Sequence, residues 1–234
     1  MSEKPAGGDI ICQRVTKVYT IKDVETHALR GVDLTVKQGE FTAIAGPSGS
    51  GKTTLLNLIG GLDQPTSGTI HLDGLEISAL PQGRLSEIRL RKMGFVFQAY
   101  NLIPVLSGLE NVEYILLLQG LSAKERRARA EAILTEVGLG DIMNKRPMEM
   151  SGGQQQRVAV ARAIVHEPEL VLADEPTANL DSKTAEGLLH LMLVLNQKKS
   201  CTFLFSTHDA RVMEHARRLV SIRDGKVDAD EIKK

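Results

Sequence analysis

The chain has 234 residues, of which 42% are hydrophobic and 25% charged, and its 29 basic residues balance 29 acidic ones. This composition is ordinary for a globular protein, and the zero net charge gives no bulk attraction to nucleic acid. No apolar run approaches the roughly 18 residues of a membrane span, and the N-terminus has no signal-peptide core. We therefore expect a cytoplasmic protein of one large domain, with no nucleic acid among its partners.

The first third of the chain is predicted to form short strands around one helix. Residues 1–8 are expected to be a loose tail. Apolar alternation predicts strands at 9–18, 28–36, 41–45 and 69–72. A helix is predicted at 52–59, directly after a glycine-rich loop. Turn signals such as Asp73-Gly74 join the strands and indicate an antiparallel sheet near the N-terminus.

The middle of the chain is predicted to be helical. A helix at 84–93 and a strand at 94–97 are followed by residues 105–144, which show no convincing strand. We therefore predict a helical insertion at 98–153. The basic stretch KERRARA within it is best interpreted as a solvated helix face.

From residue 170 strands and helices alternate again. Strands are predicted at 170–173 and 202–206, and helices at 182–197 and from 210 onward. Val220 to Val227 is predicted to be a hairpin that turns at Asp224-Gly225. The predicted fold is α/β and one domain, 1–234. Its core, with the antiparallel β-subdomain, is formed by 9–97 and 154–234.

The two cysteines are isolated in the sequence. Cys12 and Cys201 each lie in an apolar, strand-like run without metal-ligand spacing. We expect two buried thiols rather than a disulfide or a metal site.

A glycine-rich loop carries the strongest motif of the chain. GPSGSGKT, from Gly46 to Thr53, fits Gly-x-x-x-x-Gly-Lys-Ser/Thr and lies between an apolar strand and a helix. Its backbone N–H groups can converge on phosphate oxygens, while Lys52 reaches the β and γ phosphates and Thr53 ligates Mg²⁺. The loop predicts a P-loop NTPase (RecA-like) core. The predicted ATP-binding residues here are Gly46, Ser48, Gly49, Ser50, Gly51, Lys52, Thr53 and Thr54.

Polar residues at strand ends supply the remaining chemistry. Asp174, which ends LVLAD, is placed to hold Mg²⁺, and Glu175 follows it as the residue that polarises the attacking water. Gln98 ends GFVFQ and can ligate Mg²⁺ or position that water, while His208, after the strand 202–206, can contact the γ-phosphate. Tyr19 can stack on adenine. The other histidines are expected to be ordinary surface or packing residues: His27, His71, His166, His190 and His215.

A second anion site is predicted about a hundred residues after the first. In MSGGQQQRVAVARA, Ser151 can cap a helix, and Gly152 and Gly153 leave its first backbone N–H groups bare. A helix N-terminus without a ligand of its own favours an anion.

Taken in order, these motifs resemble those of the ATP-binding cassette (ABC) ATPases. The set covers almost the whole chain: Tyr19, GPSGSGKT, Gln98, SGGQ at 151–154, LVLADEP, ANLD at 178–181 and His208. The resemblance implies ATP hydrolysis with Mg²⁺ by two copies packed head to tail. It implies that Asp181 couples the two sites. It further implies that the γ-phosphate of one chain is bound in trans by Ser151, Gly152, Gly153 and Gln154 of the other.

The resemblance also implies a role in transport. With one cassette and no long coiled coil, the chain is similar to the ATPase subunit of a transporter, held at the inner face of the membrane by a separate membrane subunit. The segment after Gln98 would contact that subunit through Tyr100, Leu102, Ile103 and Leu106, although packing of the helical insertion also explains these side chains. GGLDQPTSGTIHLDG, FVFQAYNLIP and SGLENV are similar to MacB and LolD types. FtsE-type and BceA-type cassettes are also close, so an ATP-driven switch acting on a cell-wall hydrolase is the alternative.

Overall fold

The computed structural model describes residues 9–22 and 24–233, so the tail expected at 1–8 lies outside the described residues. The strands are β1 (Ile10–Ile21), β2 (Val24–Val36), β3 (Phe41–Ala45), β4 (Ser67–Leu72), β5 (Leu75–Glu76), β6 (Met93–Val96), β7 (Leu170–Asp174), β8 (Thr202–Thr207), β9 (Arg218–Arg223) and β10 (Lys226–Ile232). The helices are α1 (Lys52–Ile59), α2 (Gln82–Lys92), α3 (Gly108–Leu118), α4 (Ala123–Glu136), α5 (Gly152–Ile164), α6 (Ser182–Lys199) and α7 (Ala210–His215), with 3₁₀ turns η1 (Gly140–Ile142) and η2 (Pro147–Glu149).

The central sheet is mixed and has the strand order β10-β9-β3-β8-β7-β6. Neighbouring strands from β9 to β6 are parallel, and β10 is antiparallel to β9. The predicted hairpin is confirmed, since its turn residues Asp224 and Gly225 have φ of 49° and 76°, as a tight hairpin turn requires. The carboxyl ends of β3, β6, β7 and β8 therefore meet at one edge, where α/β proteins bind ligands.

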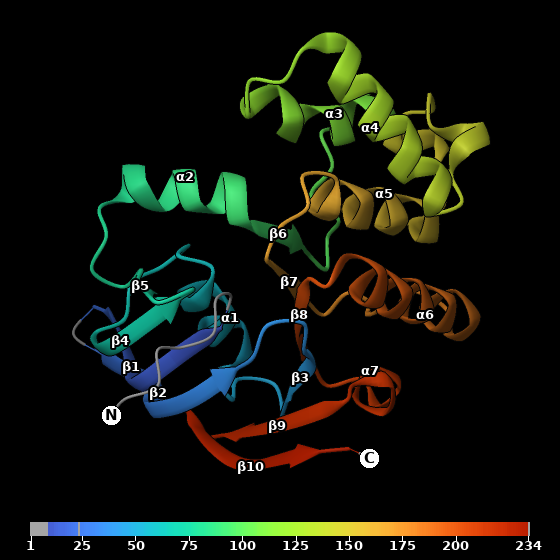
Figure 1. Ribbon diagram of the computed structural model, residues 1–234. Coiled ribbons are helices and arrows are strands. Elements are labelled where there is room, and N and C mark those ends of the chain that lie inside the picture. The colour runs from blue at the N-terminus through green and yellow to red at the C-terminus, as the bar shows by residue number, and fades with distance from the viewer. Residues whose placement is uncertain (1–8, 23, 234) are drawn as a thin grey trace.

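The central strands are buried on both faces, which explains their unbroken apolar runs. On one face Phe41, Phe203 and Phe205 share a core with α5 and α6. On the other, Leu172 and Leu204 pack with α1 and the second sheet. Figure 1 shows α6 to the right of β7 and β8, and β1, β2, β4 and β5 to their left.

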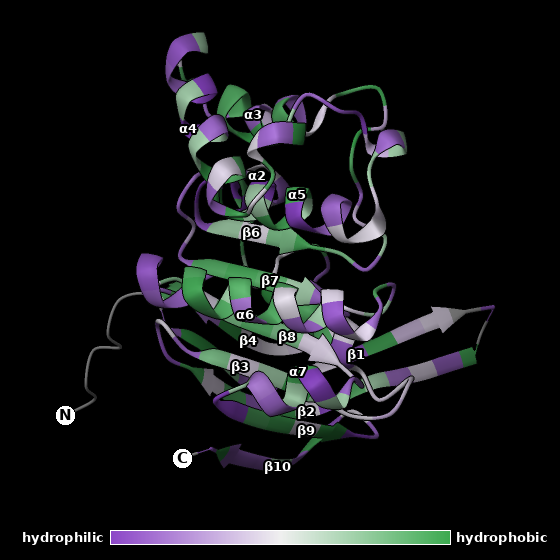
Figure 2. Cartoon of the chain, turned by 90° about the vertical axis from the view of Figure 1, so that its right-hand side faces the viewer, coloured by the Kyte–Doolittle hydropathy of each residue, from purple (hydrophilic) through white to green (hydrophobic). Residues whose placement is uncertain are grey.

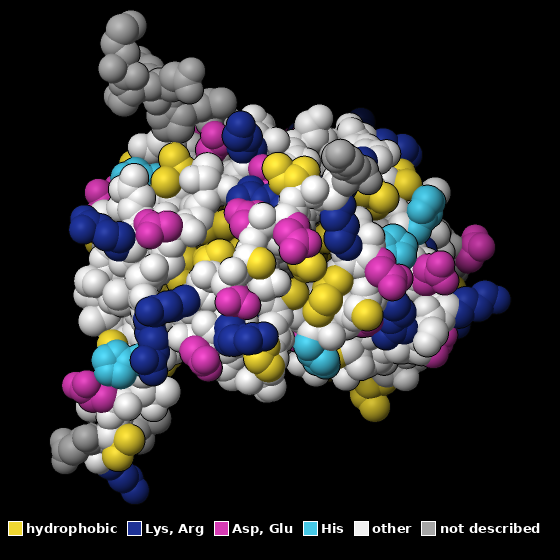
Figure 3. Space-filling view, turned by 90° about the horizontal axis from the view of Figure 1, so that it is seen from below, with side chains coloured by type: hydrophobic (Ala, Val, Ile, Leu, Met, Phe, Trp, Pro, Cys, Tyr) yellow, Lys and Arg dark blue, Asp and Glu magenta, His cyan; other side chains and the backbone are white. Residues whose placement is uncertain are grey.

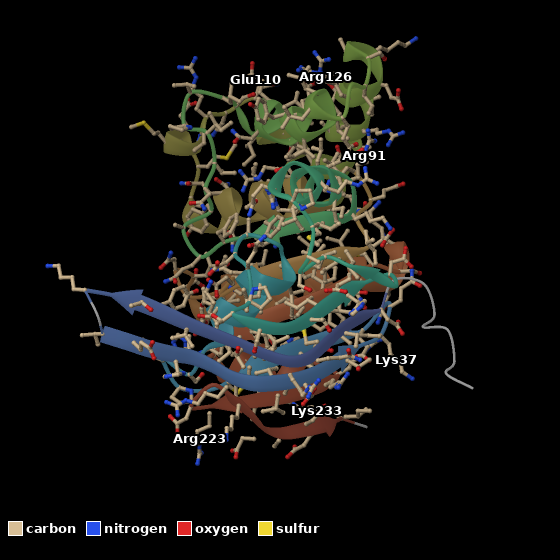
Figure 4. The ribbon with its side chains drawn as sticks, turned by 90° about the vertical axis from the view of Figure 1, so that its left-hand side faces the viewer. Lys37, Arg91, Glu110, Arg126, Arg223 and Lys233 are labelled. Atoms are coloured by element: carbon tan, nitrogen blue, oxygen red, sulfur yellow. The ribbon has the colours of Figure 1, made fainter. Side chains whose placement is uncertain are left out.

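The second sheet is antiparallel, as predicted, with the order β2-β1-β4-β5. Strands β1 and β2 form a long hairpin, which runs past the neighbouring strands in Figures 2 and 4. The pairing shifts within this hairpin: Lys17 lies opposite Leu29 while Val18 lies opposite His27. Ala28 is thus an extra residue, a β-bulge of the kind often found beside functional sites.

The helical part comprises α3, α4, the two 3₁₀ turns and α5, as Figure 1 shows at the top. Ser107 begins α3 with a reciprocal capping box to Glu110. Figure 4 labels Glu110 and Arg126 at the end of the molecule opposite Arg223 and Lys233. Helix α5 begins at Gly152, so the predicted limit of the insertion at 153 falls inside its first turn. The division into subdomains stays a prediction.

Both cysteines are buried free thiols, as expected. Burial raises the pKa of Cys12 to about 12 and that of Cys201 to about 11. Among the described residues, none of the helices is both long and apolar enough to span a bilayer. On the face seen in Figure 3, basic and acidic side chains of the described residues are interspersed.

Candidate functional site

The P-loop opens onto a cleft at the carboxyl edge of the central sheet. The cleft has a volume of about 730 Å³. It brings the loop together with three residues predicted from distant strand ends, Gln98, Glu175 and His208. It is lined by Thr26, His27, Ala28, Pro47, Ser48, Gly49, Gly51, Lys52, Thr53, Thr54, Gln98, Glu175 and His208.

Two glycines of the loop are required by their surroundings. Gly51 has φ +107°, and a Cβ there would lie 2.6 Å from the carbonyl oxygen of Ala28. A Cβ on Gly46 would lie 2.2 Å from the carbonyl oxygen of Ile222. Helix α1 then begins at Lys52 without a side-chain cap or an acidic residue in its first turn. Its first N–H groups therefore remain available to an anion.

Lys52 and Ser50 are buried polar residues in this loop. The ammonium of Lys52, whose residue is only 7% exposed, donates to the carbonyl oxygens of Gly46 at 2.9 Å and Pro47 at 3.0 Å. The Ser50 hydroxyl is buried and has no hydrogen-bond partner among the described residues. Such orphaned groups are rare in proteins and point to a polar ligand.

Thr53 and Asp174 meet between the P-loop and β7. The Thr53 hydroxyl donates to Asp174 Oδ1 at 2.9 Å, and the Ser206 hydroxyl donates to the same oxygen. No group of three His, Cys, Asp or Glu residues within the described ranges could enclose a metal. A hydroxyl, a carboxylate and the nearby Gln98 amide fit Mg²⁺, which keeps water and substrate phosphate oxygens as its other ligands.

Glu175 and His208 form a direct pair. Nδ1 of His208 lies 2.7 Å from Glu175 Oε1, and the imidazole is 68% exposed while the carboxylate is 13% exposed. Glu175 has φ +45°, a strained conformation that costs about 1–3 kcal/mol and is typical of functional sites. Its backbone N–H donates to the Ser206 carbonyl at 3.0 Å, which fixes the carboxylate at the cleft.

Tyr19 lies beside the cleft rather than among its lining residues. Its hydroxyl donates to Asp63 Oδ2 at 2.9 Å. The pKa of Tyr19 is raised, first by burial and then by Asp63, while a hydrogen bond with Thr54 lowers it. Because Thr54 lines the cleft, the hydroxyl end of Tyr19 lies at the cleft's rim.

The SGGQ segment is separate from the P-loop cleft in this chain. Ser151 caps α5 in a reciprocal capping box with Gln154, and none of residues 151–154 is among the described residues that line the cleft. A Cβ on Gly152 would lie 2.8 Å from the Tyr100 hydroxyl, and one on Gly153 would lie 2.4 Å from the Thr184 methyl group. The two predicted phosphate sites thus do not meet within one chain.

Asp181 caps helix α6. It accepts hydrogen bonds from the Thr184 N–H at 3.0 Å and the Thr184 hydroxyl at 2.6 Å. The Thr184 hydroxyl is the first cause that lowers the pKa of Asp181. Gly153 also lies against Thr184. Thr184 therefore contacts both Asp181 and the start of α5.

Residues of β2 enter the cleft although the sequence did not indicate it. His27 was expected to be an ordinary surface or packing histidine, yet it lines the cleft with Thr26 and Ala28. Strand β2 approaches the P-loop at the bulge, where the Ala28 carbonyl lies against Gly51, and no sequence signal marks the bulge. Ser206, which binds Asp174, was likewise not predicted, although it lies two residues before His208.

An apolar groove of about 420 Å³ lies between the central sheet and the helical part. Its lining includes Phe95, Phe97, Ile103, Tyr114 and Ile115, with Arg89, Arg162 and His166. Of the four side chains expected to meet a partner, Ile103 lines this groove. Tyr100 and Leu102 line a neighbouring hollow of about 340 Å³, and Leu106 is half-buried.

Comparisons with known proteins agree on one family. The sequence profile of the ABC transporter family matches residues 29–178. The lipoprotein-releasing system ATP-binding protein LolD of Anaeromyxobacter dehalogenans is 46% identical over 98% of this chain and 97% of its own length. The macrolide export ATP-binding/permease protein MacB of Syntrophobacter fumaroxidans is 46% identical over 93% of this chain, which spans 31% of that longer protein. A dimeric structure of the cassette MJ0796 of Methanocaldococcus jannaschii, in a post-hydrolysis state bound to ADP and Pi, superposes with a TM-score of 0.89 at 43% identity, over 96% of this chain and 99% of that one.

Proposed function

Because the chain belongs to the ABC transporter family and is an ATP-binding, ATP-hydrolysing cassette, we propose that it drives a separate membrane subunit of MacB or LolD type. Two copies would close head to tail around two ATP molecules. The observation that carries this proposal is the separation of the two anion sites: the P-loop cleft holds Glu175 and His208, while Ser151 stands apart from it. The names of the LolD and MacB relatives support the type of transporter.

ATP would bind with its phosphates in the P-loop. The ammonium of Lys52, now bound to the loop's own carbonyls, would exchange them for the β and γ phosphates. The open N-terminus of α1 adds backbone donors and a favourable dipole. Tyr19 at the rim would stack on the adenine, and the orphaned hydroxyl of Ser50 would gain a phosphate partner.

Thr53, Asp174 and Gln98 would hold the Mg²⁺ that accompanies ATP. The direct hydrogen bond from Thr53 to Asp174 would open so that the hydroxyl and the carboxylate face the ion, the latter through water. When bound, Mg²⁺ neutralises part of the charge on the phosphate oxygens. Ser206 keeps Asp174 at the end of β7 meanwhile.

Hydrolysis would use Glu175 as the base for the attacking water. His208 is within hydrogen-bond reach of that carboxylate, and it would turn toward the γ-phosphate and keep the water in line with it. Most of the rate enhancement in such a reaction comes from positioning and charge stabilisation.

The partner copy would complete each site. The γ-phosphate held by the other chain would bind at the N-terminus of α5, at Ser151, Gly152, Gly153 and Gln154. Two such contacts obey one two-fold axis, so the interface is self-complementary. Asp181 and Gly153 both contact Thr184. Asp181 would therefore link the two ATP sites of the dimer. The dimer described for MJ0796 supports this arrangement.

The membrane subunit would dock in the apolar groove beside Ile103, which would keep the chain at the membrane surface. Phe97 and Asn101 of the groove's lining flank Gln98 in the chain, and the Gln98 carbonyl accepts a hydrogen bond from Asn179 at 2.9 Å. Closure at the ATP site can therefore reach the groove through Gln98. The coupling requires that open and closed dimers bind the membrane subunit differently.

The experiment that tests the function is hydrolysis by Glu175→Gln. This variant should bind MgATP with near wild-type affinity and lose roughly 100-fold or more in turnover, as expected when a general base is removed. Glu214→Gln, an exposed carboxylate on α7, is the matched control and should hydrolyse ATP normally. Near-normal turnover by Glu175→Gln would contradict the proposed mechanism.

A further inference from the structure

Tyr19 is held in place by two residues that the proposed mechanism leaves unused. Lys17 precedes it by two residues on β1, so both side chains lie on the same face of that strand. The ammonium of Lys17 stands 4.9 Å from the centroid of the Tyr19 ring. A cation at this distance over an aromatic face is attracted to it.

Asp63 binds both side chains at once. Its Oδ1 accepts from the Lys17 ammonium at 2.7 Å, and its Oδ2 accepts from the Tyr19 hydroxyl at 2.9 Å. Burial tends to raise the pKa of Asp63, but the hydrogen bonds from Lys17, Gln64 and Tyr19 bring it below its usual value. The Lys17 side chain is only 13% exposed, so this ion pair is partly shielded from water.

Asp63 is also tied to the P-loop helix. It lies in the loop after α1, and the N–H groups of Leu62 and Asp63 both approach the carbonyl oxygen of Asn57 on that helix, at 2.9 and 3.4 Å. Lys17 additionally donates to the Gln64 carbonyl at 2.7 Å. The strand that carries Tyr19 is thereby fixed to the helix that follows the phosphate-binding loop.

From this geometry we infer that Lys17 and Asp63 are positioning residues for the nucleotide base: they hold the Tyr19 ring so that its free face receives adenine. Lys17 covers one face of the ring, so adenine would stack on the opposite face. The Asp63 contact sets the distance between the base site and the phosphate site. This inference rests on the proposed role of Tyr19 in ATP binding.

The test measures the contribution of the base to binding separately from that of the phosphates. The affinities of MgATP and of magnesium tripolyphosphate, which lacks ribose and base, are measured by calorimetric titration. Lys17→Met should weaken MgATP binding by about three- to tenfold, the range of a partly buried cation–aromatic contact, and leave tripolyphosphate binding unchanged. Lys17→Arg should restore most of the loss, because it keeps both the cation and the pair with Asp63. Lys22→Met, an exposed lysine of the same hairpin, should change neither affinity.

Two comparisons identify which claim fails. In a Tyr19→Ala background, Lys17→Met should cause no further loss of MgATP affinity, since it acts through the ring. Equal losses for both probes, or unchanged or tighter MgATP binding in Lys17→Met, would overturn the inference while leaving the ATPase assignment intact. If Tyr19→Ala alone kept full MgATP affinity, the proposed base site would fail and the inference with it.

Discussion

At the scale of single residues, Gly51 shows how closely the P-loop is fitted to its neighbours. Its φ of +107° already favours glycine, and the Ala28 carbonyl occupies the space a Cβ would take. Gly51→Ala should therefore lower the free energy of unfolding by about 1–3 kcal/mol or more and weaken MgATP binding. Gly31→Ala is the control, because Gly31 has φ +89° but no atom within 4 Å of a Cβ. Denaturant titration of both should show the larger loss at Gly51; equal losses would mean that the close approach of Ala28 does not matter.

His166 predicts a pH dependence of stability. Its Nε2 lies 3.1 Å from the Met93 carbonyl, which requires the proton on that nitrogen, and its Nδ1 is buried without a partner among the described residues. Burial is the main cause that lowers the pKa of His166 below 6.5. Below about pH 6.5 the unfolded chain binds a proton on His166 more readily than the folded chain does. The free energy of unfolding therefore falls as the pH drops below about 6.5.

Replacement of His166 should remove this part of the acid sensitivity. His166→Gln is expected to lose less unfolding free energy than wild type between about pH 7.5 and about pH 5.5, as measured by urea unfolding. His190→Gln, at an exposed position on α6, should behave like wild type. A steeper loss in His166→Gln would show that the imidazole is protonated in the folded state.

At the scale of elements, helix α5 links the SGGQ segment to the segment after Gln98. Near its end, Arg162 donates to the carbonyl oxygens of Tyr100 at 2.8 Å and of Asn101. Both of those residues have positive φ, 60° and 50°, so the arginine holds a strained turn. At its start, Gly152 lies against the Tyr100 hydroxyl.

Arg162→Met should release this turn. We expect a loss of about 2 kcal/mol in unfolding free energy, since hydrogen bonds to a charged donor are removed, and faster hydrogen exchange across residues 99–104. Arg91→Met, on the exposed side of α2, is the matched control. Unchanged exchange at 99–104 in Arg162→Met would show that other contacts hold the turn.

The elements of the core could be predicted because local patterns dictate them. Helix α1 and strand β3 have the predicted limits, 52–59 and 41–45, since a glycine loop and an unbroken apolar run mark them. Strand β7 was predicted to within one residue, and its end placed Asp174 beside Thr53. The hairpin turn could be predicted because an Asp-Gly pair, here Asp224-Gly225, readily adopts the positive φ angles of a tight turn.

Contacts that depend on register could not be predicted in the same way. The bulge at Ala28 that brings His27 to the cleft leaves no mark in the sequence. Asp63 binds Lys17 and Tyr19 across 46 and 44 positions of the chain, and neither lysines nor aspartates are distinctive enough to signal these contacts. Likewise, Arg162 reaches back about sixty residues to bind a turn.

At the scale of the whole molecule, the two predicted anion sites do not meet within one chain. The P-loop cleft holds Glu175 and His208, and the start of α5, which Ser151 caps, lies outside that cleft. A second copy related by a two-fold axis is the simplest way to bring each helix start to the other chain's phosphate. ATP would then be part of the interface, so dimerisation and ATP binding must depend on each other.

The most direct test of this claim is the molar mass of Glu175→Gln in solution, by light scattering after gel filtration, with and without MgATP. We expect a monomer of 25.5 kDa without nucleotide, a dimer with MgATP, and loss of the dimer when Ser151→Arg is added. A monomer that persists while MgATP is bound, or a dimer that Ser151→Arg leaves intact, would contradict it.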